Sequence, residues 1–152
     1  MQDVNVTWES PGAFIHVDDQ PWLPMSDSQQ QGGIEWKLMY ARPGNSRWTV
    51  MYRGPAGSAI MPHIHAGEAE GYLFYGKVTT STPEHAGSGE GFILEPAGAH
   101  HPLTRLLEDT CFILTMDGPI RWLQDDGSEL VQTPDSAMTE WARQKAEHTS
   151  TH

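Results

Sequence analysis

A chain of 152 residues with 38% hydrophobic side chains can bury one sizeable core, so one domain over residues 1–152 is expected. Its 20 acidic and nine basic side chains give a net charge of -11, which repels nucleic acid and anionic membrane surfaces. Cys111 has no partner for an intramolecular disulfide, and no apolar run approaches the roughly 20 residues of a membrane span. The sequence therefore predicts a cytoplasmic protein.

The first half of the chain carries the pattern of short strands. Residues 1–31 mix proline, glycine and polar residues with scattered apolar ones, which predicts an irregular lead-in. Apolar and polar residues then alternate over 33–40 and 48–52, on either side of a Pro-Gly-Asn turn, which predicts an antiparallel hairpin. Further strands are expected over residues 60–65, 71–75, 77–81, 92–94, 110–116, 120–124 and 129–131.

A single helix is expected near the end of the chain. Thr133 is its predicted N-cap, Pro134 lies in its first turn, and the helix is predicted over residues 134–147, with 148–152 as a frayed tail. Met138, Trp141 and neighbouring residues form its apolar stripe. Many short strands followed by one helix predict an all-β sandwich or small barrel rather than an α/β fold.

Two histidines lie two residues apart in the expected strand 60–65. Side chains two apart in a strand share a face, so His63 and His65 would point the same way and form half of a metal site. A third ligand could come from His100 or His101, which follow the apolar strand 92–94. An ordinary half-buried histidine pair is the alternative, although buried imidazoles need partners.

The spacing around these histidines resembles the two cupin motifs. Gly57, His63-x-His65, Glu70 and Gly76 resemble the first motif, and Pro96-x-Gly98-x-x-His101 resembles the core of the second. Each motif departs from the usual spacing by one residue, between Glu70 and Gly76 and between Gly91 and Pro96. The resemblance implies a single-domain cupin, a small β-barrel or jelly roll, here with a C-terminal α-helix.

Within the cupins, the chain resembles three-histidine dioxygenases of the acetylacetone (β-diketone) type. The resemblance runs through Gly32-Gly-Ile-Glu-Trp-Lys-Leu, His63-Ile-His-Ala-Gly, Gly98-Ala-His-His and Gly118-Pro-Ile, and reaches the Trp141 helix. It implies that His63, His65 and His101 bind non-haem Fe(II) without a carboxylate, and that a small ketone and O2 are the substrates. Zn, Ni or Co also suits such a nitrogen-rich site.

Two carboxylates near the histidines are further candidates. Glu70 matches the usual cupin carboxylate spacing, but the three-histidine resemblance predicts that it stays outside the coordination sphere. Glu95 lies near the third histidine and could orient an imidazole through its second nitrogen, with a solvated loop carboxylate as the alternative. The enzymes that the chain resembles have more aromatic side chains around the metal. The candidates here are Ile60, Met61, Phe112, Leu114 and Met116.

The expected chemistry is oxidative cleavage of a carbon-carbon bond in a β-diketone or hydroxy-ketone, whose enolate a dipositive cation stabilises as a Lewis acid. Two other functions use the same residues. One is a non-catalytic zinc cupin of the regulatory type. The other is a metal-dependent isomerase or lyase, with Tyr72, Tyr75 or Glu70 as acid or base. Tryptophan-rich strand edges also predict a homodimer or homotetramer.

Overall fold

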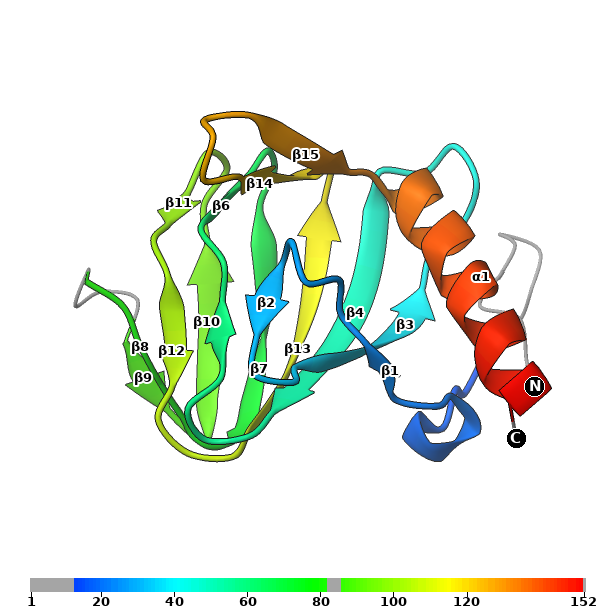
Figure 1. Cartoon of the computed structure of the whole chain (residues 1–152), viewed down its shortest axis with the longest axis horizontal. Coiled ribbons are helices and arrows are strands. Elements are labelled where there is room, and N and C mark those ends of the chain that lie inside the picture. Colours follow the sequence, from blue (N-terminus) through cyan, green and yellow to red (C-terminus); the bar gives the residue numbers. More distant parts are fainter. Residues whose placement is uncertain (1–12, 82–85, 152) are drawn as a thin grey trace.

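The computed structural model describes residues 13–81 and 86–151, and it consists mainly of β-strands (Figure 1). The first 12 residues of the predicted lead-in lie outside the described part. Residues 13–31 contain a short 3-10 turn, Val17–Asp19, and two short strands. The predicted all-β class with one C-terminal helix is confirmed.

Three antiparallel sheets make up the described structure. The largest has six strands in the order β1 (Leu23–Pro24), β3 (Glu35–Tyr40), β4 (Arg47–Gly54), β13 (Thr110–Asp117), β7 (Ala69–Tyr75) and β10 (Gly91–Glu95). The second has four strands in the order β11 (His100–His101), β6 (His63–His65), β14 (Ile120–Leu123) and β15 (Glu129–Gln132). The third has five strands in the order β2 (Gln30–Gln31), β5 (Ala59–Ile60), β12 (Thr104–Leu106), β8 (Lys77–Thr79) and β9 (Gly87–Ser88).

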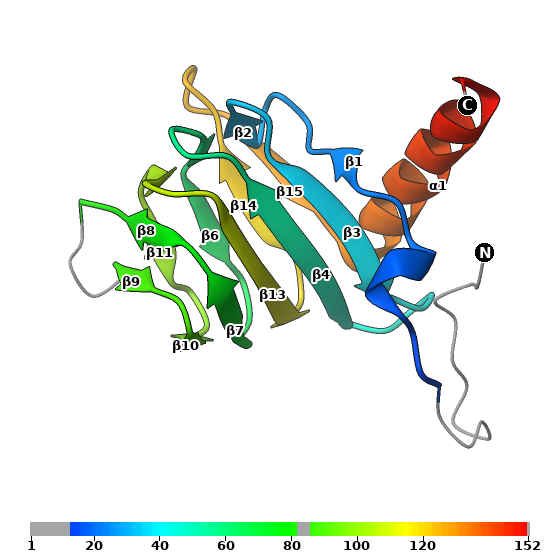
Figure 2. The same ribbon diagram turned by 90° about the horizontal axis from the view of Figure 1, so that it is seen from below.

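The alternating sequence of the first hairpin explains where the core lies. Strands β3 and β4 pair with Trp36 opposite Tyr52 and Leu38 opposite Val50, and these four side chains are buried. Strand β13 then pairs with both β4 and β7, which places Phe112, Leu114 and Met116 in the same core. Figure 2 shows β6 and β14 in a layer on the other side of this core from the large sheet.

The predicted strand 60–65 is two strands instead of one. Strand β5 ends at Ile60 and pairs with β2 and β12, whereas β6 begins at His63 and pairs with β11 and β14. The break falls at Met61 and Pro62, because proline has no N–H to donate to a continuous ladder. The chain thus leaves one sheet and enters another immediately before the first histidine.

The helix α1 (Pro134–Thr151) begins where the cap signal predicts and continues four residues beyond its predicted end at 147. Thr133 and Ser136 cap it reciprocally: the Ser136 N–H donates to Thr133 Oγ1 (3.0 Å), and the Thr133 N–H donates to Ser136 Oγ (2.8 Å). Ala137 and Trp141 are buried. No helix in the described ranges is both long and apolar enough to cross a membrane.

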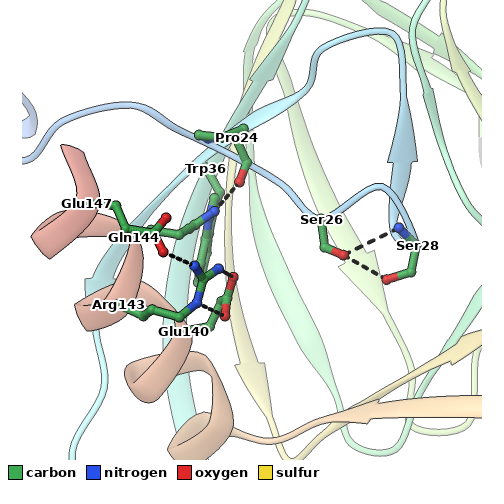
Figure 3. Close-up of polar contacts among 8 residues, drawn as sticks. All are labelled: Pro24, Ser26, Ser28, Trp36, Glu140, Arg143, Gln144 and Glu147. Carbon is green, nitrogen blue, oxygen red and sulfur yellow. Dashed lines mark hydrogen bonds and ion pairs between the residues drawn. The ribbon is translucent and has the colours of Figure 1, made fainter. Parts of the chain in front are cut away.

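Polar and aromatic contacts attach the helix to the large sheet. Gln144 accepts a hydrogen bond from Trp36 Nε1 (2.8 Å) and donates one to the carbonyl of Pro24 (2.6 Å), as Figure 3 shows. The Trp36 and Trp141 rings meet edge to face, with centroids 5.1 Å apart. The helix therefore covers the β1 and β3 side of the large sheet, whose other end is β10, while the histidines lie on β6 and β11 of the second sheet (Figure 1).

Among the residues that the structure describes, the tryptophan side chains do not form the exposed strand edges from which a homo-oligomer was predicted: Trp22 is partly buried, and Trp8 lies outside the described residues. Trp36, Trp48, Trp122 and Trp141 are each at most 4% exposed. The exposed large aromatic side chains on β7 and β10 are instead Tyr72, Phe74, Tyr75 and Phe92.

Candidate metal centre

Strand β6 places two histidines on the inner side of its sheet. His63 and His65 are buried, whereas Ile64 between them is partly exposed, as the alternation of side chains in a strand requires. Strand β14 runs beside them, with Trp122 opposite His63 and Ile120 opposite His65. The Trp122 ring lies 4.8 Å from the His63 ring, centroid to centroid, and closes one side of the site.

The third histidine comes from the other neighbour of β6. Strand β11 pairs with β6 so that His101 is opposite His63 and His100 is opposite Ile64. Gly98, at a φ of +82°, makes the turn before β11, and backbone hydrogen bonds join this turn to His65 on both sides (Gly98 N to His65 O 2.8 Å, His65 N to Ala99 O 3.1 Å). His101 is buried and His100 is exposed.

The three inward histidines form a compact cluster. Their candidate ligand atoms all lie within 4.8 Å of one another. His63 donates from Nδ1 to the Met61 carbonyl (2.9 Å), which fixes its ring and leaves Nε2 as the free acceptor. Burial, and secondarily the neighbouring His65, lowers the pKa of His63 to about 3, so this imidazole is neutral near pH 7.

Glu95 approaches two of the three imidazoles. Its Oε2 atom lies 2.8 Å from His65 Nε2 and 3.3 Å from His101 Nε2. Burial alone would raise the pKa of Glu95, but the contacts with His101 and His65 together hold it below its usual range. The sequence left open whether Glu95 is a solvated loop carboxylate. The structure instead places it at the end of β10, mostly buried, facing the cluster.

Glu70 lies on the opposite side of the large sheet. It belongs to β7, between Thr115 of β13 and Leu94 of β10, and its side chain is exposed, whereas the adjacent Ala69 is buried. The strand alternation that turns Ala69 inward therefore turns Glu70 away from the histidines. The structure does not bring Glu70 to the cluster.

A cavity of about 350 Å³ opens beside the histidines. Ile60, Phe112 and Leu114 line it, as the sequence suggested, but Met61 and Met116 do not. Its walls also include aromatic and aliphatic side chains that the sequence did not single out, chiefly Tyr52, Leu73, Ile120 and Trp122. The wall is therefore more aromatic than the sequence predicted.

Tyr52, which the sequence did not single out, carried a signal that periodicity could have found, and Glu95, which the sequence named as a candidate, carries the same signal. Tyr52 continues the inward series of Trp48 and Val50 along β4, so it is a polar side chain at a core position. Glu95 likewise continues an alternating series in β10, where Phe92 and Leu94 face out and are more than 60% exposed. A polar residue in phase with core residues indicates either a buried hydrogen bond or a site.

The cluster has the chemistry of a metal-binding site. Three imidazoles that converge, one of them neutral and oriented by a backbone carbonyl, are a nitrogen-rich donor set that suits Fe(II), Zn, Ni or Co. Cavity space adjoins the ligands, so a ligand from solution can reach the same point. The three donor atoms, within 4.8 Å of one another, form a group that can hold one metal ion.

A small β-barrel whose wall holds a cluster of inward histidines defines a cupin-like protein with a candidate metal centre. Residues 10–121 match the family described as the ChrR cupin-like domain. The chain belongs to this family, and the predicted resemblance to cupins is confirmed.

Comparison with individual proteins supports the narrower resemblance as well. The chain is 31% identical over 118 residues to an acetylacetone-cleaving enzyme of Acinetobacter johnsonii, covering 75% of this chain and 77% of that one. The structure of an acetylacetone dioxygenase from Acinetobacter johnsonii is similar, with a TM-score of 0.81, 27% identity and coverage of 95% and 99% of the two chains. A cupin-like protein of Ralstonia eutropha JMP134 shares the fold at 16% identity, with a TM-score of 0.75 and coverage of 95% and 91%.

Proposed function

We propose that this protein is a metal-dependent dioxygenase that uses O2 to cleave a carbon-carbon bond of a β-diketone or hydroxy-ketone, with Fe(II) as its physiological metal. The observation that carries the proposal is the cluster of His63, His65 and His101 beside an apolar cavity. The similarity to an acetylacetone-cleaving enzyme over three quarters of the chain supports the substrate class.

The three histidines hold the metal in this proposal. Because His63 is neutral and its Nδ1–H is engaged by Met61, its Nε2 lone pair is available at neutral pH without the loss of a proton. When bound, the divalent cation supplies Lewis-acid stabilisation of an enolate and, as iron, a redox partner for O2. Glu95 adds a negative charge beside His65 and His101, which attracts the cation and orients the rings.

The cavity sets the size and polarity of the substrate. A volume of about 350 Å³ lies at the lower end of ligand sites, so it takes a small molecule. Leu73, Leu114 and Ile120 contribute apolar surface that excludes water from the reacting ketone. Because the chain carries a net charge of -11, long-range attraction of anions is disfavoured, and the ketone enters neutral.

A non-catalytic metal-binding cupin of the regulatory type is the second candidate, because the family is described by ChrR, which is an anti-sigma protein in a solved complex with SigE. It uses the same three histidines but needs neither O2 nor a cavity.

The isomerase or lyase alternative has lost its candidate acids and bases. Glu70 faces outward, Tyr72 and Tyr75 are 37% and 52% exposed, and none of the three lines the cavity.

The setting that we propose for this reaction is the cytoplasm, because the buried Cys111 remains a free thiol. We also propose a homodimer or homotetramer. Support comes from exposed apolar side chains on β7 and on the sheet-edge strand β10, namely Tyr72, Phe74, Phe92 and Leu94.

Oxygen consumption tests the proposed reaction directly. Protein purified without metal is loaded anaerobically with one equivalent of Fe(II) and mixed with pentane-2,4-dione or an aryl hydroxy-ketone in an oxygen electrode. We expect one O2 to be consumed per ketone, and 18O from labelled O2 to appear in the two carbonyl products. The zinc-loaded protein is the control, since Zn is not redox-active and should bind the ketone without O2 uptake.

The purified protein also distinguishes the two candidates by its metal. Protein isolated anaerobically should contain iron and consume O2 with a member of the ketone panel. Stoichiometric zinc in that preparation, together with no O2 uptake after iron loading, would favour the regulatory cupin.

A further inference from the structure

The polar groups on the cavity wall differ in how their hydrogen-bonding capacity is used. The histidines and Glu95 face one another, and Thr104 Oγ1 donates to the Pro102 carbonyl (3.3 Å). Ser88 lies in the exposed strand β9. The Tyr52 hydroxyl makes no hydrogen bond to any residue in 13–81 or 86–151, yet it is not one of the polar atoms that the fold shuts off from solvent, so it is open to the cavity although only 6% of the residue is exposed.

The Tyr52 ring is held in place. Strand pairing puts Tyr52 of β4 opposite Phe112 of β13, and the two rings stack with centroids 5.1 Å apart and an interplanar angle of 26°. Trp36 flanks Tyr52 on the other side in the register of β3 and β4. The ring, and with it the hydroxyl, is thus held at one position on the cavity wall.

A hydroxyl that opens into a mostly apolar cavity and has no partner in the described protein is a hydrogen-bond donor available to a bound ligand. Phenylalanine would fill the same space and keep the stacking on Phe112, but it would offer no donor to the cavity. The hydroxyl at the cavity wall therefore indicates that a ligand supplies its acceptor. Burial, and secondarily the charge of Glu95, raises the pKa of Tyr52, so the phenol keeps its proton and acts as a donor.

We infer that the Tyr52 hydroxyl donates a hydrogen bond to a carbonyl or enol oxygen of the substrate. This inference rests on the proposed function and adds to it a substrate-binding residue on β4, outside the histidine strands and outside both cupin motifs. The donor selects for ketones with an acceptor oxygen near Tyr52. A ligand without that oxygen leaves the hydroxyl unpaired and binds more weakly.

Ligand binding to Tyr52→Phe tests the inference without relying on turnover. Pentane-2,4-dione is titrated into the zinc-loaded protein, and its dissociation constant is measured from the change in ultraviolet absorbance. We expect the Tyr52→Phe variant to bind it about tenfold more weakly than the unmodified protein, as for the loss of one hydrogen bond. Tyr72→Phe is the matched control, because Tyr72 lies on the exposed face of β7 and its hydroxyl donates to Glu90 (2.9 Å). It should leave the dissociation constant unchanged.

Thermal unfolding of the same variants separates binding from structure. Without the diketone, zinc-loaded Tyr52→Phe should have the same Tm as the unmodified protein, because the variant keeps the ring and its stacking on Phe112. Equal dissociation constants for the two proteins would overturn the role of Tyr52 while the proposed function stands. A lowered Tm with lost zinc would also overturn it, since Tyr52 would then act structurally. If the zinc-loaded unmodified protein binds no diketone, the proposed function fails and this inference fails with it.

Discussion

The two faces of the large sheet both bury titratable side chains, but they use them differently. On the outer face, Lys37 is 2% exposed, donates from Nζ to the Val17 carbonyl (2.6 Å) and lies 4.7 Å from the centre of the Trp22 ring. Its charge is thus already balanced by a carbonyl dipole and a π face. On the inner side, Glu95 and the histidines face one another beside open space.

Burial of a charge therefore does not by itself indicate a site. Lys37 fixes the segment that carries Val17 and Trp22 against the outer face, where Met39, Met51 and Cys111 form a second small core. Its role is structural, because every contact that it makes comes from the fold. Glu95 and the inward histidines, in contrast, have atoms that can still bind a metal or a substrate, because the fold itself does not use all of their interactions.

The largest expected effect is loss of the metal when an inner histidine is removed. His63→Ala, His65→Ala and His101→Ala should each lose most of the bound metal, because two remaining imidazoles cannot hold a divalent ion as tightly as three. Metal content after dialysis against a weak chelator measures this. His100→Ala is the matched control, since His100 is exposed and turned away, and it should keep its metal. An empty site in His100→Ala alone would show that the strand register is wrong.

The second effect is acid sensitivity of the metal-free protein. His63 has a pKa of about 3 in the fold, lowered chiefly by burial, and about 6.5 in the unfolded chain. Between these values the unfolded chain binds more protons, so stability is present above pH 6.5 and falls as the pH drops, by up to about 1.4 kcal/mol per pH unit. Glu95, whose pKa is lowered, adds a loss of the same sign below about pH 4.3.

Urea unfolding of the metal-free protein at pH 4.5 and 6.5 measures this linkage. We expect a loss of about 2 kcal/mol from His63 across this interval. His63→Gln should remove most of the pH dependence, and His100→Gln should not change it. Equal stability of the unmodified protein at the two pH values would mean that His63 is not buried as a neutral imidazole.

These tests rest on features that the sequence predicted to different degrees. Side-chain alternation was sufficient to place His63 and His65 on one face, because a period of two survives small errors in strand ends. It did not reveal that β5 and β6 belong to different sheets, although Pro62 carried that signal. The sequence could say only that one of His100 and His101 faces the site, because adjacent residues in a strand point in opposite directions. The pairing of β11 with β6 places His101 beside His63 and thus shows which one it is.

The cavity wall was harder to predict than the histidine cluster. Tyr52 precedes His63 by 11 positions and Trp122 follows His101 by 21, and only the closure of the sheets brings them to one cavity. Sequence motifs describe residues near one another in the chain, so they found the histidines and missed the opposite wall. The helix end shows the same limit on a smaller scale: no glycine or proline follows residue 147, and α1 continues to Thr151.

Glu95 and Glu70 are the two carboxylates named as site candidates, and they lie on the inner and the outer face of the large sheet. Single substitutions of the two therefore compare the faces at the smallest expected effect. Glu95→Gln keeps the size of the side chain but removes the charge that lies 2.8 Å from His65 Nε2. We expect metal affinity to fall about 10-fold to 100-fold, as for other groups that orient a metal ligand. Competition with a chromophoric chelator measures the affinity. An unchanged affinity would mean that Glu95 neither orients the imidazoles nor attracts the cation.

Glu70→Gln is the matched variant on the other face of the same sheet. The Glu70 side chain is exposed on β7, and the buried Ala69 beside it requires Glu70 to point away from the histidines. The variant should therefore keep iron, with a metal affinity within about twofold of the unmodified protein, because a distant exposed charge is screened by solvent and salt. Loss of iron from Glu70→Gln would instead mean that the β7 register is shifted by one residue. Such a shift would turn every inward-facing side chain of β7 outward. Such a shift would add a carboxylate to the ligands and make the regulatory function the better proposal.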